Sequence, residues 1–177
     1  YSENATIMSS YLQDKLEYQS FIMNIGLRYD EFDPRTNHII DLINPEVGKV
    51  ASNKKTMWSP RIGVAFPITD QGILHFSYGH FFQMPTMRNL FLTSIFGAGL
   101  APSIGYGDLK PQKTVMYEFG LQQQLSHFIA INGSLFFKDI RDLLALQSIS
   151  YVSPTYGPSS YAVYLNKDYS MVQGITL

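Results

Sequence analysis

The side chains that could bind a metal or carry acid–base chemistry are few, and their spacing brings no set of them together. The chain has no cysteine, and its four histidines are His38, His75, His80 and His127. On a strand, His75 and His80 would lie on opposite faces, because side chains alternate with a period of two. No histidine stands at metal-ligand spacing from a second ligand. We therefore expect neither a metal site nor a cofactor.

The carboxylates and serines give no better case for catalysis. Asp30, Asp33 and Asp41 could hold calcium, but they lack the spacing of an EF-hand loop, so we interpret them as solvated loop charges. The Gly-x-Ser-x-Gly sequence of a nucleophile elbow does not occur. Without cysteine there is no thiol nucleophile. We expect no catalytic residues, and hence a binding or transport protein rather than an enzyme.

The composition favours a protein whose surface meets lipid. Charged residues make up 15% of the chain, against ~25% in soluble domains, while aromatic residues reach 14%. The one long apolar run, residues 90–104, is interrupted by Gly97, Gly99 and Pro102 and is too short for a spanning helix. The net charge of -1 gives no electrostatic reason to expect nucleic acid as a partner.

A strict alternation of apolar and polar residues is the strongest structural signal, and it is clearest over residues 113–138. The apolar positions are Val115, Tyr117, Phe119, Leu121, Ile129, Ile131, Leu135 and Phe137. A short link around Ser126 and His127 separates the two halves. This pattern predicts an antiparallel hairpin with one apolar and one polar face.

The same reading along the chain predicts about seven strands. They cover residues 7–17, 21–30, 58–66, 73–82, the two halves of 113–138, and 161–177. The faces of the first strand stay unassigned, because Asp14 shares a face with Leu12 and Leu16. Aromatic residues stand near strand ends, as in the girdles of membrane barrels, and examples are Tyr29, Trp58, Phe66, Tyr78, Phe82 and Phe137.

The connections between these strands alternate between short and long. Tight links at residues 17–20, 69–72 and 126–127 are followed by long ones at 33–57, 83–112 and 141–160. Long loops are uncommon in compact domains, whereas outer-membrane barrels have short periplasmic turns and long outer loops. We expect an all-β fold, an antiparallel transmembrane β-barrel of which this chain forms about seven consecutive strands. A soluble β-sandwich would show the same alternation and is the alternative.

Two groups of residues are candidates for function. On the polar face, predicted to line the lumen, the candidates are Arg28, Arg61, His75, Glu118 and Lys138, which either contact another domain or substrate or form a hydrated wall. Glycines recur on that face, which indicates either a close neighbour or bends of the sheet. In the outer loop 83–112, the candidate ligand contacts are Met84, Met87, Arg88, Phe91, Phe96 and Tyr106. The alternative for the loop is a small core of its own, with a short helix near residues 86–94.

The segment GDLKPQKTVMYEFGLQQQL, residues 107–125, resembles a signature of TonB-dependent outer-membrane receptors. In that family an Asn-Pro-x-Leu-Lys-Pro-Glu stretch leads into a strand with Tyr-Glu-x-Gly; here Asp-Leu-Lys-Pro leads into Tyr-Glu-Phe-Gly, the Asn-Pro is absent and Gln112 replaces the Glu. Further similar segments are YLQDKLEY, IGLRYDEFDP, SPRIGVAFPI, SYGHFFQMPTMRNLF and FFKDIRDLL. They follow the order of the family and cover most of the chain.

The resemblance implies a barrel plugged by an N-terminal domain, in the outer membrane of a Gram-negative-type bacterium. Such receptors capture scarce nutrients, such as ferric siderophores, vitamin B12 or glycans, and import them with energy from the TonB complex. The implied partners are outer-membrane lipid, the plug domain, the TonB complex and a small-molecule or glycan ligand. We expect residues 1–177 to be a partial barrel domain without the plug. An outer-membrane pore or barrel enzyme is the first alternative function, and a soluble β-sandwich binding module is the second.

Overall fold

The computed structural model describes residues 4–18, 21–91, 93–94 and 102–177, and these residues form a single curved sheet with a small outer region. The long strands are β1 (Thr6–Tyr18), β2 (Phe21–Asp33), β5 (Lys55–Thr69), β6 (Gly72–Gln83), β9 (Gln112–Ser126), β10 (Ile129–Ser153) and β11 (Gly157–Thr176). The short elements are β3 (Asn37–Ile39), β4 (Lys49–Ala51), α1 (Met87–Phe91), β7 (Thr93–Ser94) and β8 (Ser103–Ile104). The seven long strands confirm the expected number.

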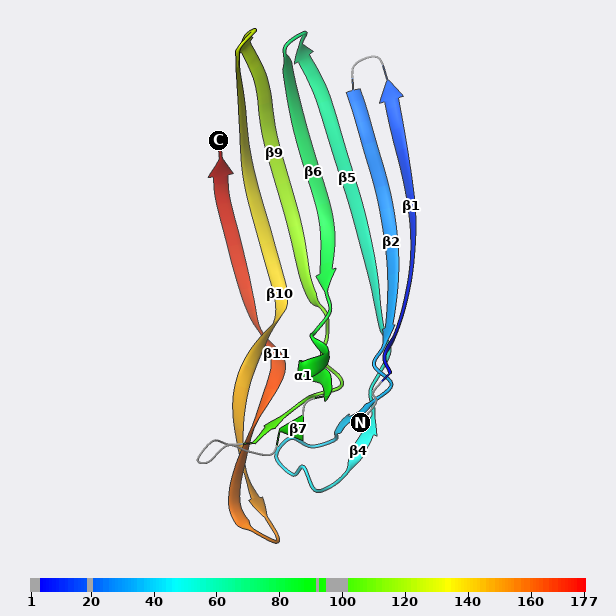
Figure 1. Ribbon diagram of the computed structural model, residues 1–177, viewed down its shortest axis with the longest axis vertical. Helices are drawn as coiled ribbons and strands as arrows, with labels where there is room; N and C mark the ends of the chain where they lie inside the picture. Colours follow the sequence, from blue (N-terminus) through cyan, green and yellow to red (C-terminus); the bar gives the residue numbers. More distant parts are fainter. Residues whose placement is uncertain (1–3, 19–20, 92, 95–101) are drawn as a thin grey trace.

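The long strands form an antiparallel meander in which each strand pairs with the next long strand in sequence. The tight turns lie together at one end of the sheet, and the long connections lie at the other (Figure 1). The parallel strand β8 adds to the outer part of β11, and β3 pairs with β4 in a separate two-stranded sheet. The sheet is open within the described residues, so this is a partial barrel. No helix in these ranges is long and apolar enough to cross a membrane.

Register assigns the two faces of every long strand, including the first. Tyr117 of β9 stands opposite Tyr78 of β6 and Phe137 of β10, so the apolar residues of the expected hairpin share one face with those of its neighbours. Leu12 of β1 is opposite Leu27, which puts Leu12, Asp14 and Leu16 on that apolar face.

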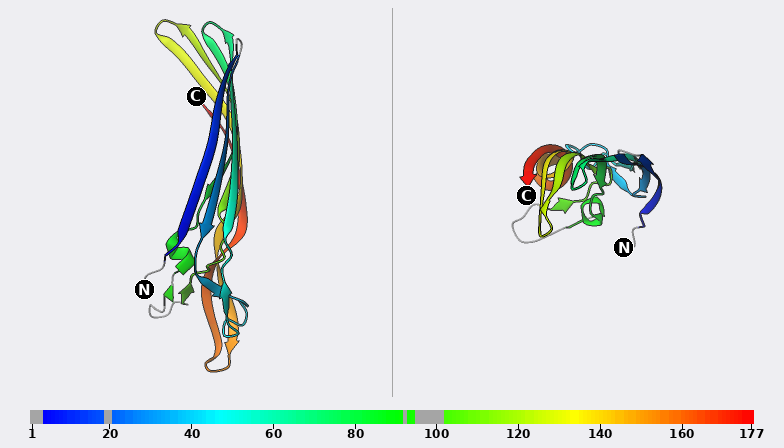
Figure 2. Two further views of the ribbon diagram at one scale, coloured as in Figure 1. Left: turned by 90° about the vertical axis from the view of Figure 1, so that its right-hand side faces the viewer. Right: turned by 90° about the horizontal axis from the view of Figure 1, so that it is seen from above.

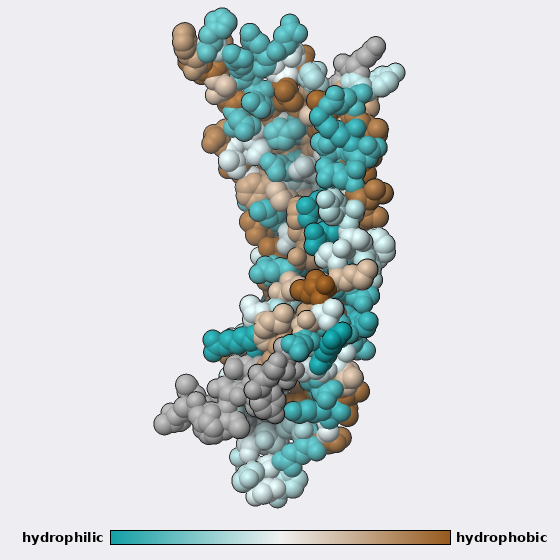
Figure 3. Space-filling view, turned by 45° about the vertical axis from the view of Figure 1, so that its right-hand side comes forward, coloured by the Kyte–Doolittle hydropathy of each residue, from teal (hydrophilic) through white to brown (hydrophobic). Residues whose placement is uncertain are grey.

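The polar face is the concave one. Phe32 and Met57 continue the polar-face positions of β2 and β5, and both pack against Leu90 of α1. Viewed from above, α1 lies inside the curve of the sheet (Figure 2). Side chains on the face that carries α1 are mainly hydrophilic over the long strands (Figure 3). The concave face is therefore the wall that a closed barrel would turn toward its lumen.

The prediction of an outer loop at residues 141–160 is wrong. β10 and β11 continue through this range as a paired hairpin that turns at residues 154–156. The register explains the error. Ile140 pairs with Ser170, Leu143 with Asp168, and Leu144 with Asn166. β10 therefore carries one extra residue between the first two pairs, and β11 carries one between the last two. Each bulge moves its strand out of phase by one residue, so the alternation breaks although the strands do not.

Candidate ligand-binding site

The loop between β6 and β9 folds back onto the outer end of the concave face. The backbone amides of Asn89 and Leu90 donate to the carbonyl of Thr86 at 2.9 and 3.3 Å, which starts α1 where a short helix was expected. The helix turns Leu90 onto the sheet, where Leu90 and Leu109 are 2% and 1% exposed beside Phe32 and Met57. The apolar residues of the loop thus do pack, but on a core shared with Phe32 and Met57 of the sheet and not on a core of the loop alone, and this shared core anchors the loop.

A second outer loop, residues 34–54, packs against the first at Gly107. A Cβ at this glycine would overlap Thr36 and Ser52, so only glycine allows the loops to approach this closely. Beside it, the carboxylate of Asp108 accepts hydrogen bonds from Lys55 and from the backbone amide of Asn53. Burial opposes ionisation of Asp108, but these bonds and the positive charge of Lys55 outweigh burial and lower its pKa. Asp108 is thus held as a carboxylate at the junction of the two loops.

The outer hairpin of β10 and β11 holds both loops from a third side. Tyr161 and Val163 of β11 are 2% and 1% exposed, and they pack with Leu42 of one loop and Ile104 of the other. The hydroxyl of Tyr161 donates to the carbonyl of Leu42 at 2.6 Å, and burial raises the pKa of this phenol. Ser153 donates to Glu46 at 2.7 Å. The three outer segments therefore form one packed unit.

Asn166 of β11 connects this unit to the sheet at the two successive bulges of β10 and β11, here called the double bulge. Its carboxamide accepts the backbone amide of Lys110 at 2.8 Å and donates to the carbonyl of the same residue at 2.9 Å. It also donates to the carbonyl of Asp142, at 2.8 Å, and Asp142 has the left-handed φ of 60°. One side chain thus joins the loop after α1 to the bulged strand.

A hollow of about 220 Å³ opens between the loop and the bulge. Its lining residues are Gln83, Met84, Pro85, Thr86, Asn89, Lys110, Gln112, Leu143 and Leu144. Amides, a hydroxyl and an ammonium group supply polar contacts, while the thioether of Met84 and the two leucines supply an apolar side. This combination suits a ligand with both polar and apolar parts.

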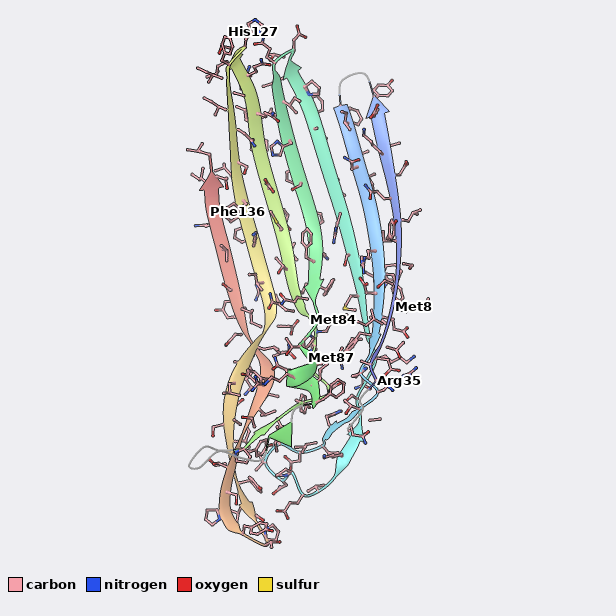
Figure 4. The ribbon with its side chains drawn as sticks, viewed as in Figure 1. Met8, Arg35, Met84, Met87, His127 and Phe136 are labelled. Carbon is pink, nitrogen blue, oxygen red and sulfur yellow. The ribbon has the colours of Figure 1, made fainter. Side chains whose placement is uncertain are left out.

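The expected loop contacts separate into three groups. Met84 lines the hollow, and Met87 and Arg88 are exposed on α1 (Figure 4 labels Met84 and Met87). Phe91 and Tyr106 pack against the core around Leu90, as Met84 also does, and so they serve the fold as well. Phe96 lies outside the described residues. The sequence reasoning missed Gln83, Asn89, Lys110 and Gln112, since polar residues in a loop carry no periodic signal.

The expected lumen residues all lie on the concave face, in several environments. Arg28 pairs with Asp30 through bonds of 2.8–3.0 Å, and Ser9 donates to Asp30 at 2.6 Å, so Asp30 is a paired strand residue and not a solvated loop charge. Arg61 lies 4.6 Å from the centre of the Phe81 ring, and Lys138 lies 5.1 Å from that of Phe136. No group of three His, Cys, Asp or Glu in the described ranges could hold a metal.

Several glycines of the concave face make room for rings. The ring of His75 covers Gly120, which pairs with it across strands β6 and β9, and that of Phe136 (labelled in Figure 4) covers its partner Gly174. Phe81 covers Gly79 in the same strand. Gly63, by contrast, has no atom within 4 Å of where its Cβ would stand. At Gly79, Gly120 and Gly174, the lack of a side chain thus leaves room for an aromatic or imidazole ring against the concave face.

A family model described as the TonB-dependent receptor-like β-barrel matches residues 1–177, the whole chain. The chain belongs to this family of outer-membrane receptors. A TonB-dependent heme receptor A from Haemophilus ducreyi is 26% identical over 130 residues, which cover 72% of this chain and 18% of the relative.

Solved receptors share the fold of the chain. The hemophore receptor HasR of Serratia marcescens, solved with its hemophore HasA and heme, has a TM-score of 0.74 at 18% identity over 98% of this chain. The siderophore receptor PirA of Pseudomonas aeruginosa has a TM-score of 0.69 at 14% identity over 97% of this chain. The chain spans 31% and 30% of these two receptors, so it corresponds to under a third of each barrel-bearing protein.

Proposed function

We propose that the whole protein is an outer-membrane receptor that imports a scarce, iron-bearing compound such as heme or a ferric siderophore. The observation that carries this proposal is the hollow at the outer end of the concave face, held in place by the packed outer loops and Asn166. At about 220 Å³ it can receive one part of such a compound, and the rest would lie against the concave face. A ligand that settles there would stand at the mouth of the barrel. The heme and siderophore receptors that resemble the chain support the choice of compound.

In this proposal, residues 1–177 are part of the barrel, and a plug domain elsewhere in the protein fills the space along the concave face. Arg28, Arg61, His75, Glu118 and Lys138 then line the lumen wall. The TonB complex supplies energy from the inner membrane, and the protein does no bond chemistry. Membership of a receptor family supports these statements, as does the absence of charge on most of the convex face of the long strands.

The test is uptake of radiolabelled heme and of ferric enterobactin by cells that produce the full-length protein. We expect uptake of one of these probes to stop when the proton gradient is collapsed. Uptake that continues without the gradient would indicate a passive pore. Uptake of neither probe, in cells where the receptor is assembled, would reject heme and ferric enterobactin as the imported compound.

The hollow itself is tested by Lys110→Met, which removes the ammonium group and keeps the length of the side chain. We expect weaker binding of the imported probe to cells at unchanged receptor abundance. Lys167→Met is the matched control, because Lys167 is exposed at the bulge and does not line the hollow. Point changes are preferable to a loop deletion, because Leu90 and Leu109 anchor the loop to the sheet.

A further inference from the structure

The convex face carries an apolar band of the height that a bilayer requires. On β2 the band runs from Phe21 to Tyr29, and the first charge beyond it is Glu31. Paired aromatic rings mark its ends: the ring centres of Tyr29 and Trp58 are 4.8 Å apart, and those of Phe21 and Phe66 are 6.0 Å apart. Such a run is about nine residues long, within the ~9–11 that a tilted strand needs to cross a membrane.

Asp14 interrupts this band near its middle. It stands opposite Ile25, which lies midway between Phe21 and Tyr29, and its neighbours on the same face are Leu12 and Leu16. Leu12 is 76% exposed, as a side chain facing lipid should be. Between the aromatic ends, Asp14 is the one charged residue on the convex face of β1, β2 and β5. Farther along the sheet, Asp139 of β10 also lies on that face, near the outer end, and it pairs with Arg141.

The described part of the chain offers Asp14 no ion-pair partner. The nearest cation in sequence, Lys15, stands opposite Asn24 on the concave face and pairs with Glu17 instead. Across the sheet on one side, Asp14 meets Ile25, with Met23 and Leu27 next to it. On its other side, β1 is an edge of the described sheet. A partner along the sheet can therefore come only across that edge.

A bare carboxylate at this depth is unfavourable, and the side chain cannot relieve it alone. Ionisable groups inside a membrane are costly and are found paired or facing a water-filled space. A long lysine or arginine can reach the interface, but an aspartate has a single methylene and cannot. Even when the carboxyl binds a proton it stays a polar group in lipid, so a hydrogen-bond partner close by stabilises either form.

We propose that Asp14 accepts a hydrogen bond, within the membrane, from a donor side chain on the strand that pairs with the free edge of β1 in the whole receptor. Residues directly opposite or diagonal on adjacent strands are close enough for this contact. The bond would select one register for that pairing, since a slip of one residue turns the donor to the other face. The proposal depends on the barrel fold and not on which compound is imported.

The test is equilibrium unfolding of the full-length receptor in lipid vesicles by urea. If a donor is paired with Asp14, Asp14→Leu leaves that donor unsatisfied in lipid, so the urea midpoint falls. Asp14→Asn keeps an acceptor and should lower the midpoint less. If Asp14 is unpaired, Asp14→Leu removes a charge from lipid, and an equal or higher midpoint would overturn the proposal.

Ile25→Asp is the comparison variant, because it places a carboxylate opposite Asp14 on the same face without an intended donor, and its midpoint should fall. If Asp14→Leu is not recovered folded, the fraction of receptor assembled in cells, measured by heat-dependent gel mobility, replaces the midpoint. The proposal requires better assembly of Asp14→Asn than of Asp14→Leu. Equal assembly of the two variants, or better assembly of Asp14→Leu, overturns it.

Discussion

The carboxamide of Asn166 donates to the carbonyl oxygen of Asp142 at 2.8 Å, across the point where both strands of the outer hairpin carry an extra residue. The same carboxamide makes two hydrogen bonds with the backbone of Lys110. One side chain therefore joins the bulge to the loop that lines the hollow.

Replacing Asn166 by leucine should release the loop that ends at Lys110. Three hydrogen bonds are lost, and backbone groups are left without partners, so we expect a loss of about 1–3 kcal/mol in local stability. Faster hydrogen exchange at the Lys110 amide would report this. Asn166→Asp, which keeps an acceptor for that amide, should exchange at an intermediate rate, and an unchanged rate in Asn166→Leu would contradict the assignment.

The contact of the two loops at Asp108 should weaken in acid. The pKa of Asp108 is lowered in the folded protein, so its stabilising effect is complete above the ordinary aspartate pKa of ~3.9 and is lost as pH falls through the lower folded value. Hydrogen exchange of the Asn53 amide, which donates to Asp108, should accelerate in that window after correction for intrinsic rates. The Asp108→Asn variant should lack this step.

The two faces of β9 should differ in their tolerance of charge. Phe119 is 50% exposed on the convex face, whereas Gln122 lies on the concave face. In the full-length receptor, Phe119→Arg should cost ~2–4 kcal/mol if the residue lies near the bilayer midplane. Gln122→Arg should cost much less. Equal midpoints for the two variants in urea unfolding from vesicles would reject the facing assignment.

The glycines of the concave face should also differ from one another. Gly174→Ala would push the Phe136 ring off the wall, whereas Gly63 has open space where a Cβ would stand. Gly63→Ala should be neutral or stabilising by about 0.5–1 kcal/mol, because alanine loses less backbone entropy in a strand. Thermal unfolding in detergent should therefore rank Gly63→Ala above Gly174→Ala, and the reverse order would show that the ring cover is unimportant.

The sequence predicts the membrane part of this fold well, because alternation and tight turns are local signals. The hairpin over residues 113–138 was predictable in this way, whereas helix α1, which begins at Met87, lies in the range 86–94 that the sequence offered only as an alternative. The extension of β10 and β11 was not, because two successive bulges shift the phase of the alternation at Arg141 and Lys167. The first strand needed its partner Leu27 before Leu12 and Asp14 could be assigned to a face.

The candidate site was harder to predict, because its contacts join distant parts of the chain. Nothing near Asn166 in sequence indicates that it holds Lys110, 56 residues away. The aromatic and methionine content of the loop drew attention to Met84, which lines the hollow, but Met84, Phe91 and Tyr106 all pack on the core around Leu90. Residue type alone does not distinguish a side chain that packs from one that awaits a ligand.

The extra residue in β10 is compensated by the extra residue in β11, so the two strands stay paired beyond the bulges. One extra residue in either strand would turn every side chain beyond it to the wrong face, whereas one in each restores the pairing with both faces exchanged. Odd-numbered residues such as Phe137 face outward below the bulge, and Tyr161 and Val163 face the packed loops above it. The outer hairpin can therefore turn Tyr161 and Val163 toward the loops while the strands that cross the membrane keep their apolar residues outward.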